Sequence, residues 1–247
     1  MKVDKHRTVI IYIIIILLGL VCLLPLLNIV AISFSSSAAV EGNMVGLIPV
    51  GFSTAAYKKI LEDSQFWHSF LISVERVVLA LIINFVLIVL MAYPLSKTNA
   101  QFRGRNIYAN LMIFAMLFNG GMIPTFLVVK SYGLLNTVWA LVLPGAVPIF
   151  NVILVMNFFA AVPKELEEAA FIDGANPFQV LTKIFIPISK PVLATVSLFS
   201  IVGSWNDFYS GLIYMSKAAY YPLMTYIQSL QINVEDLIKQ GNLSAVV

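Results

Sequence analysis

Long apolar runs separated by short polar segments dominate the chain. Five runs reach the length of about 20 residues that a helix needs to cross the hydrocarbon core of a bilayer. They lie near residues 8–32, 70–93, 106–129, 137–162 and 191–215. A backbone in lipid must satisfy its own hydrogen bonds, which favours helices over irregular structure. We therefore predict an all-α polytopic membrane helix bundle with five visible spans.

Two of these runs contain residues that break helices. The breakers are, in chain order, Asn119, Gly120, Gly121, Pro124, Pro144 and Pro148. Adjacent glycines and prolines kink or end a helix. Lipid tolerates such a break only where neighbouring helices or water satisfy the freed backbone groups. We expect the break at 119–124 to border a pathway or a helix interface, and a passive packing kink is the alternative.

The first run follows a basic N-terminal segment, which a secretory signal peptide would also show. The run of about 25 residues is longer than the roughly 7–15 residues of a signal-peptide apolar region. We expect an uncleaved first span at 8–32. A cleaved signal peptide, with the Ser-Ala-rich residues 34–39 as its cleavage site, is the alternative.

Residues 163–191 form the most polar segment between two spans. Acidic residues at its start suit the positive end of a helix dipole. Gly174 can end this helix in a left-handed conformation. Asn176 and Pro177 are typical of the cap and first residue of a second helix, which must end or kink near Pro187. The segment is predicted to be a helix–turn–helix.

Composition supports the membrane class and excludes several kinds of site. Of the 247 residues, 60% are hydrophobic and 11% charged, whereas about a quarter of a soluble domain is charged. Cys22 is the only cysteine, so no internal disulfide is possible. The histidines, His6 and His68, are too few for a metal cluster or a His-based triad. Neither a GxxxxGK[ST] phosphate loop nor a basic patch for nucleic acid is present.

Cations are distributed unequally between the two sides of the membrane. With alternating spans, one side holds nine cations, Lys2, Lys5, Arg7, Lys97, Arg103, Arg105, Lys164, Lys183 and Lys190. The opposite side holds five, Lys58, Lys59, Lys130, Lys217 and Lys239. Because the more basic side is normally cytoplasmic, we expect a cytoplasmic N-terminus and a cytoplasmic 163–190 loop. Glu75 and Arg76 lie near a membrane boundary, where we favour snorkelling or local pairing over a functional role.

Three parts of the 163–191 segment, in order, resemble the EAA loop of ABC importer permeases. These parts are Glu168-Ala169-Ala170, then Asp173-Gly174, then Ile186-Pro187. The resemblance implies that the loop is a coupling helix that docks on a cytoplasmic ATPase. It assigns ATPase coupling to Glu168, Ala169, Ala170, Asp173, Gly174 and Pro187. An ordinary amphipathic interfacial hairpin is the alternative.

Two further segments resemble the carbohydrate-uptake branch of these permeases. Residues 118–124 are similar to its GG-x-IP signature and residues 204–208 to its WND segment. The residues expected at a translocation pathway or interface are Asn119, Gly120, Gly121, Pro124, Asn151, Trp205, Asn206 and Asp207. For Asp207, a helix-end cap near the membrane surface is an equal alternative.

The resemblance covers roughly residues 66–247, within a single transmembrane domain of residues 1–247. It implies a type I importer permease subunit for sugars or oligosaccharides in the bacterial cell membrane, not an enzyme. The implied partners are a second permease in a heterodimer, a cytoplasmic ABC ATPase dimer, an extracellular solute-binding protein and lipid. No nucleic acid, cofactor or metal is expected. Alternatives are a permease for another solute class, a secondary transporter, and an intramembrane enzyme built on Glu75, Arg76 and Asp207.

Residues 216–247 contain Glu235, Asp236 and Lys239 and no apolar run of about 20 residues. They are therefore not expected to cross the membrane. Permeases of this kind end with one more span, so we expect the chain to be a truncated or split form that lacks the sixth helix.

Overall fold

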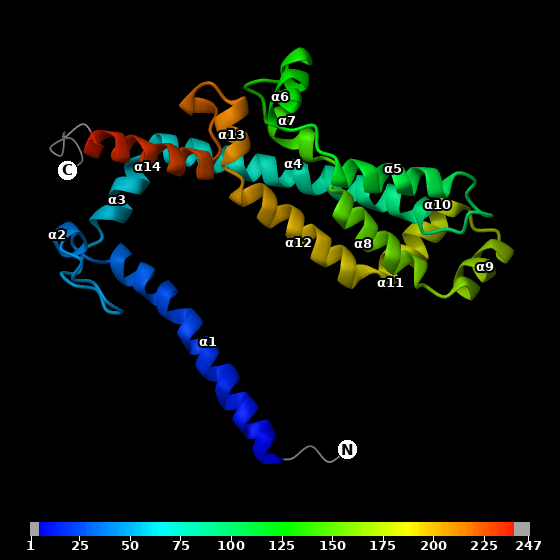
Figure 1. Cartoon of the computed structure of the whole chain (residues 1–247), viewed down its shortest axis with the longest axis horizontal. Coiled ribbons are helices and arrows are strands. Elements are labelled where there is room, and N and C mark those ends of the chain that lie inside the picture. Colours follow the sequence, from blue (N-terminus) through cyan, green and yellow to red (C-terminus); the bar gives the residue numbers. More distant parts are fainter. Residues whose placement is uncertain (1–4, 240–247) are drawn as a thin grey trace. The chain divides into compact units, whose positions relative to one another are not determined.

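The computed structural model describes residues 5–239, and within that range it contains helices and no strands. The all-α prediction is therefore confirmed for the described residues. The chain divides into two units, residues 1–64 and residues 65–247, and each is described by itself. Figure 1 shows the helices in chain order.

The first unit consists of one long helix and a short folded segment. It contains α1 (Lys5–Ser33), α2 (Ser37–Glu41) and α3 (Ala55–Glu62). The stretch Ile11–Ser33 is apolar on all sides and long enough to span a membrane, as expected for a helix whose surface meets lipid or other helices. The segment after α1 folds back on it, because Asn28 Nδ2 donates a hydrogen bond to the Gly46 carbonyl at 2.6 Å. Phe34 also stacks on Tyr57 with ring centroids 4.9 Å apart.

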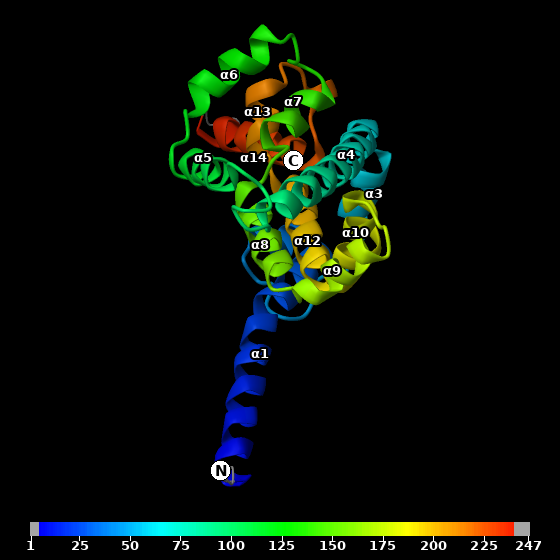
Figure 2. The same ribbon diagram turned by 90° about the vertical axis from the view of Figure 1, so that its right-hand side faces the viewer.

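The second unit is built around α4 (Ser64–Leu95), a helix of 32 residues. The other elements are α5 (Arg105–Leu117), α6 (Met122–Ser131), α7 (Val138–Val142), η1 (Leu143–Gly145), α8 (Ile149–Ala160), α9 (Lys164–Ile172), α10 (Pro177–Val180), η2 (Leu181–Phe185), α11 (Ile186–Ile188), α12 (Lys190–Asn206), α13 (Tyr209–Tyr214), η3 (Ala218–Tyr220) and α14 (Leu223–Lys239). α8 and α12 lie beside α4 (Figures 1 and 2).

Two helices by themselves could cross a membrane, and bent helix pairs account for the other spans. Counting each bent pair as one span gives up to five within the described residues. α5 and α6 are bent by 112° at the Gly-Gly break, and Val138–Gly145 and α8 are bent by 48°. The predicted interruptions of the third and fourth spans are confirmed. A third bend, of 83°, separates Pro177–Ile188 from α12.

The expected fifth span at 191–215 is interrupted, which the sequence did not indicate. α12 ends at Asn206, and Asp207 adopts an extended conformation before α13 begins. The Asp207 carboxylate accepts a hydrogen bond from the Ser210 backbone N–H at 3.1 Å. This bond satisfies a donor of the first turn of α13, so a new helix begins here without glycine or proline. The second span also differs, because α4 extends beyond the expected 70–93 at both ends.

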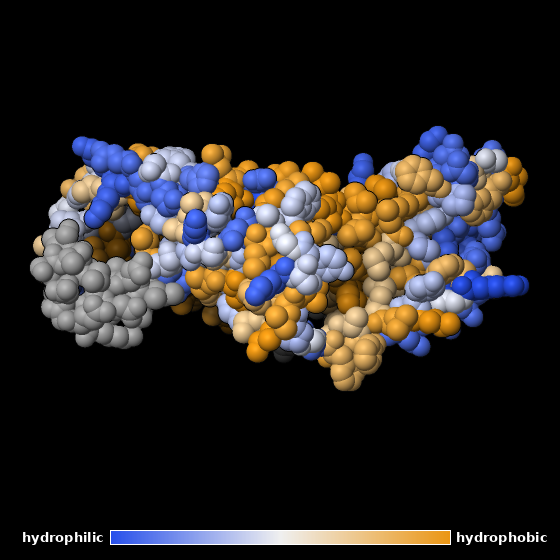
Figure 3. Space-filling model, turned by 90° about the horizontal axis from the view of Figure 1, so that it is seen from above, coloured by the Kyte–Doolittle hydropathy of each residue, from blue (hydrophilic) through white to orange (hydrophobic). Residues whose placement is uncertain are grey.

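The main core lies where α4, α8 and the residues around α12 meet. Its buried members include Ile88, Ala92, Val152, Val155, Phe159, Val180, Leu181, Phe185 and Val196. Figure 3 shows hydrophobic residues over the middle of the second unit and hydrophilic residues at the end that carries α9 and α10. This distribution fits a bundle whose apolar belt faces lipid.

The 216–247 segment contains an amphipathic helix, α14, which the sequence analysis does not predict. Residues 240–247 of this segment lie outside the described part.

One close contact between α13 and α14 gives a stability prediction. A Cβ atom on Gly211 would lie 2.8 Å from the Thr225 Cβ, and Thr225 is fully buried. We expect Gly211→Ala to destabilise the protein by about 1–3 kcal/mol, the usual cost of overpacking. Thermal unfolding in detergent measures the change. Gly19→Ala is the control, since nothing lies within 4 Å of its added Cβ, and equal melting of the two variants would contradict the packing.

Candidate functional site

The 163–191 segment folds as the predicted helix–turn–helix. Gly174 ends α9 with φ +80°. The Ala175 N–H donates to the Ala170 carbonyl at 2.9 Å and the Gly174 N–H to the Phe171 carbonyl at 3.1 Å. These two bonds form a Schellman motif. The left-handed conformation predicted for Gly174 is thus confirmed.

The second helix of the hairpin begins with a reciprocal cap. The Asn176 side chain accepts from the Gln179 N–H, and the Gln179 side chain accepts from the Asn176 N–H, both at 2.9 Å. η2 follows as a π-helical turn of five residues. It ends at α11, where Pro187 lies exposed. The hairpin is therefore held by its own turn and cap.

The hairpin presents a mixed surface. Of the residues that the family resemblance singles out, Ala170 is half-buried against the core, and Glu168, Ala169, Asp173, Gly174 and Pro187 are exposed. Two large apolar side chains are exposed beside them, with Ile172 at 86% and Phe178 at 66%. Apolar side chains of this size, exposed at the polar end of the bundle, are typical of a protein-binding surface.

An ion pair joins the hairpin to the end of α4. Lys97 Nζ lies 2.6 Å from Glu167 Oε1, and both side chains are about nine-tenths buried. The Lys97 ammonium also lies 4.1 Å from the centroid of the Tyr93 ring and 4.2 Å from that of Phe185. Burial lowers the pKa of Lys97 below its usual value, and the hydrogen bond to Glu167 opposes this shift. The contact between Lys97 and Glu167 was not predicted, because the sequence contains no local signal for it.

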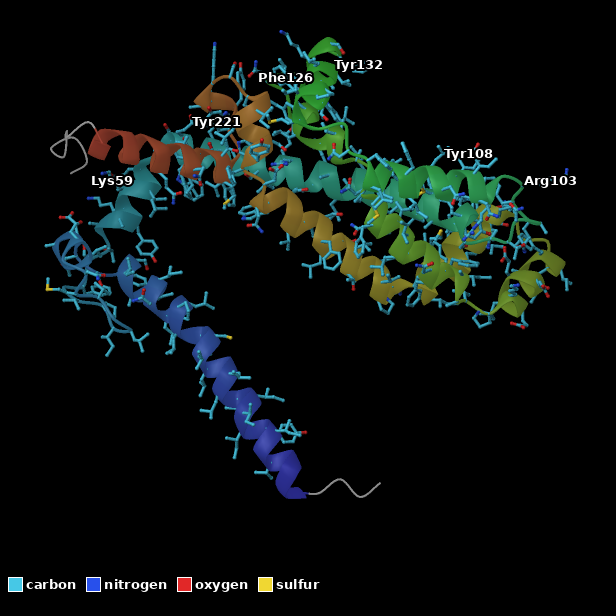
Figure 4. The ribbon with its side chains drawn as sticks, viewed as in Figure 1. Lys59, Arg103, Tyr108, Phe126, Tyr132 and Tyr221 are labelled. Carbon is cyan, nitrogen blue, oxygen red and sulfur yellow. The ribbon has the colours of Figure 1, made fainter. Side chains whose placement is uncertain are left out.

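The same ion pair places two polar loops at one end of the second unit. The segment after α4 and the 163–190 hairpin meet there, as expected for alternating spans. Arg103 and Tyr108 lie at this end in Figure 4, whereas Tyr221 lies towards the other end and Phe126 and Tyr132 lie on the projecting part that carries α6.

A second ion pair joins α4 to the break between α12 and α13. Arg76 is 4% exposed, and its guanidinium pairs with the Asp207 carboxylate. Arg76 Nη1 also donates to the Asp207 carbonyl at 2.8 Å. The partner is 131 positions away, so the interpretation of Arg76 as a snorkelling or locally paired residue is wrong. The Asp207 side chain thus caps α13 and neutralises the buried Arg76. The neighbouring Glu75 is exposed.

A polar cavity of about 260 Å³ lies beside the Arg76–Asp207 pair. Two buried asparagines, Asn84 and Asn151, contribute to its lining. Asn84, oriented so that its amide nitrogen donates to the carbonyls of Ala80 and Ala146 at 3.2 and 3.0 Å, accepts from Ser200 Oγ at 3.3 Å. Asn84 and Ser200 were not singled out from the sequence.

The residues expected at a pathway or interface are not all brought together. Asn151 and Asp207 line the same cavity. Trp205 packs edge-on against Phe70 of α4 with ring centroids 5.9 Å apart, and Asn206 is exposed.

The break between α5 and α6 lies apart from this cavity. Asn119, Gly120, Gly121 and Pro124 are exposed and do not line it. Gly121 has φ +87°, and its N–H donates to Asn119 Oδ1 at 2.9 Å. A role at a pathway or interface stays a prediction for these residues.

Comparison with known proteins agrees with this architecture. Residues 48–246 match the family model "Binding-protein-dependent transport system inner membrane component". The chain is 44% identical to Protein LplC of Bacillus subtilis over 87% of this chain and 72% of the relative. It is 40% identical to the polygalacturonan/rhamnogalacturonan transport system permease protein YtcP of the same organism over 95% of this chain and 80% of the relative.

A solved structure shows the same fold. It is a crystal structure of a bacterial ABC transporter involved in the import of the acidic polysaccharide alginate, which matches with a TM-score of 0.83 and 34% identity. The match covers 93% of this chain and 81% of that chain. The relatives are transport permeases rather than enzymes, as the EAA-like loop indicated. The chain therefore belongs to the binding-protein-dependent transport system inner membrane components, the permease subunits of ABC importers.

Proposed function

We propose that this chain is one of the two permeases in an ATP-driven importer of sugars or oligosaccharides. Relatives named for polygalacturonan and rhamnogalacturonan transport, and a structural match from an alginate importer, support a saccharide as the solute. An importer for another solute class is the alternative. The observation that carries the proposal is the capped hairpin with Gly174 at its turn.

The hairpin is proposed to dock on a cytoplasmic ATPase subunit. Glu168, Ala169 and Asp173 are exposed on α9, beside the apolar side chains of Ile172 and Phe178. Small residues such as Ala169 permit close approach of another chain. The excess of cations on the side that contains the 163–190 loop supports a cytoplasmic location for it. The other proposed partners are a second permease and an extracellular solute-binding protein.

The Lys97–Glu167 pair is proposed to transmit movement of the hairpin to α4. A docking surface transmits force only if it is fixed to the membrane-spanning helices. Because α9 has only nine residues, it needs contacts that attach it to those helices. The pair fixes α9 directly to the segment that follows α4. Ile88, Ala92 and Phe185 belong to the same core, so the hairpin and α4 also share apolar packing.

Substitution of Gly174 tests the coupling role. We expect Gly174→Val to reduce uptake at least about tenfold while the protein still inserts, because a β-branched residue at φ +80° costs about 1–3 kcal/mol of strain. Nothing lies within 4 Å of the added Cβ, so the effect is conformational and not a clash. Uptake and ATP hydrolysis are measured in proteoliposomes that contain the full transporter.

Gly174→Asn is the matched control, because asparagine tolerates the left-handed conformation far better than valine. It should retain most of the uptake. Glu168→Lys should weaken co-purification of the ATPase, because it reverses the charge of an exposed side chain in the middle of α9. Normal uptake by the Gly174→Val transporter, or unchanged ATPase recovery with Glu168→Lys, would argue against docking through this hairpin.

A further inference from the structure

The Arg76–Asp207 pair forms part of a polar cleft within this subunit. The cleft is defined here by Arg76, Asn84, Asn151, Ser200, Ser204 and Asp207. Its side chains come from α4, α8, α12 and the break after α12. Arg76, Asn84, Asn151 and Ser200 are each less than 9% exposed, so the cleft has a polar floor among membrane-spanning helices.

The rim of the cleft opens at the surface of the chain. Pro144, Gly145, Phe199 and Gly203 also line it, and all four are exposed. A cleft with a polar floor is not expected to open onto hydrocarbon, because lipid offers no hydrogen-bond partners. Polar groups at membrane depth instead face the interior of a bundle or a water-filled space. The opening is therefore expected to face water, a partner chain or a solute.

The charges of the cleft compensate each other. The guanidinium of Arg76 is neutralised by Asp207, and two of its nitrogens donate to that residue. The third nitrogen, Nε, is buried and has no hydrogen-bond partner among the described residues. Because this nitrogen has almost no accessible surface, it lies behind the wall of the cleft and does not contact an occupant. A compensated pair gives no net attraction for an anion.

We propose that the polar cleft is a subsite for one uncharged, hydroxylated sugar ring of the transported solute, an inference that rests on the proposed import of saccharides. Hydroxyl groups both donate and accept, which suits the amides of Asn84 and Asn151 and the serine hydroxyls. The volume of about 260 Å³ lies just below the range of about 300–1,000 Å³ for drug-sized ligands, which is appropriate for a single ring. Carboxylates of an acidic saccharide bind elsewhere.

Protection of a cysteine in the cleft tests this proposal. Ser204→Cys is introduced into a Cys22→Ser background, and the full transporter with its partner subunits is placed in nanodiscs. A small cationic methanethiosulfonate reagent labels the cysteine under three conditions. These are no sugar, a mixture of the neutral sugars cellobiose, maltose and diacetylchitobiose, and the acidic saccharide digalacturonate. We expect the neutral sugars to slow labelling by about tenfold at ten times their half-protecting concentration, as one-site occupancy requires. Ser131→Cys, exposed on α6 and outside the cleft, should label at an unchanged rate.

The affinity of the cleft is tested by a second substitution. Asn151→Leu in the Ser204→Cys transporter should raise the half-protecting concentration about tenfold, as expected for the loss of a hydrogen-bonding amide. No labelling of Ser204→Cys, equal labelling with and without sugar, or protection by digalacturonate alone would overturn the proposal. If these results occur while the transporter still couples ATP hydrolysis to uptake, the importer function stands and only the subsite fails. Absence of coupling in the Gly174 experiment would instead reject the importer function.

Discussion

The Asp207→Leu variant is expected to lose about 3–5 kcal/mol of stability, the usual cost of breaking one side of a buried ion pair. The change leaves the Arg76 guanidinium, 4% exposed, without its counter-ion. It also removes the side chain that accepts from the Ser210 N–H at the start of α13. Heating in detergent followed by size-exclusion chromatography measures the loss as a lower midpoint for monodisperse protein.

Two controls separate the buried ion pair from a general effect of charge removal. The double variant Arg76→Met/Asp207→Leu should recover much of the loss, because a buried pair can be replaced by apolar residues at little cost. Glu62→Gln removes one member of the Lys58–Glu62 pair, whose side chains are 79% and 68% exposed, and should change little. Equal midpoints for Asp207→Leu and Glu62→Gln would show that the Arg76–Asp207 pair does not stabilise the fold.

The Glu167→Lys variant is expected to import solute at least about tenfold more slowly per ATP hydrolysed. The change places two cations together where the side chains are about nine-tenths buried, so the link between α9 and α4 is replaced by repulsion. Breaking a buried pair costs about 3–5 kcal/mol, and 1.4 kcal/mol corresponds to tenfold. Uptake and ATP hydrolysis are measured on the same proteoliposomes, and their ratio is the readout.

Glu165→Lys is the matched control, because it makes the same charge change at an exposed position of α9. The exchange Lys97→Glu/Glu167→Lys should restore the ratio in part. Recovery is incomplete because a carboxylate at position 97 loses the favourable contacts that the ammonium makes with the rings of Tyr93 and Phe185. A ratio for Glu167→Lys equal to that of Glu165→Lys would remove the ion pair from the coupling route.

Local signals in the sequence were sufficient for the hairpin and for the interruptions of the third and fourth spans. Gly174 and Asn176 specify their own turn and cap, and Gly121 with Pro124 breaks a span, because each acts through its own backbone. The break at Asp207 has no such signal, since it depends on a carboxylate that caps α13 and meets Arg76. Contacts between residues 131 positions apart follow from how helices pack, which hydrophobic periodicity alone does not specify.

One ion pair lies on α4 and the other just beyond its C-terminal end, and this separation restricts how the helix can move. Arg76 lies 19 positions before the end of α4 at Leu95 (95 − 76), or about 29 Å at 1.5 Å per residue, and Lys97 follows two residues later. This separation is close to the roughly 30 Å thickness of the hydrocarbon core. A sliding motion of one helical turn along the membrane normal would draw one cation into the hydrocarbon, where charge is costly. In the membrane, α4 is therefore constrained to tilt or rotate about its axis rather than to move as a piston.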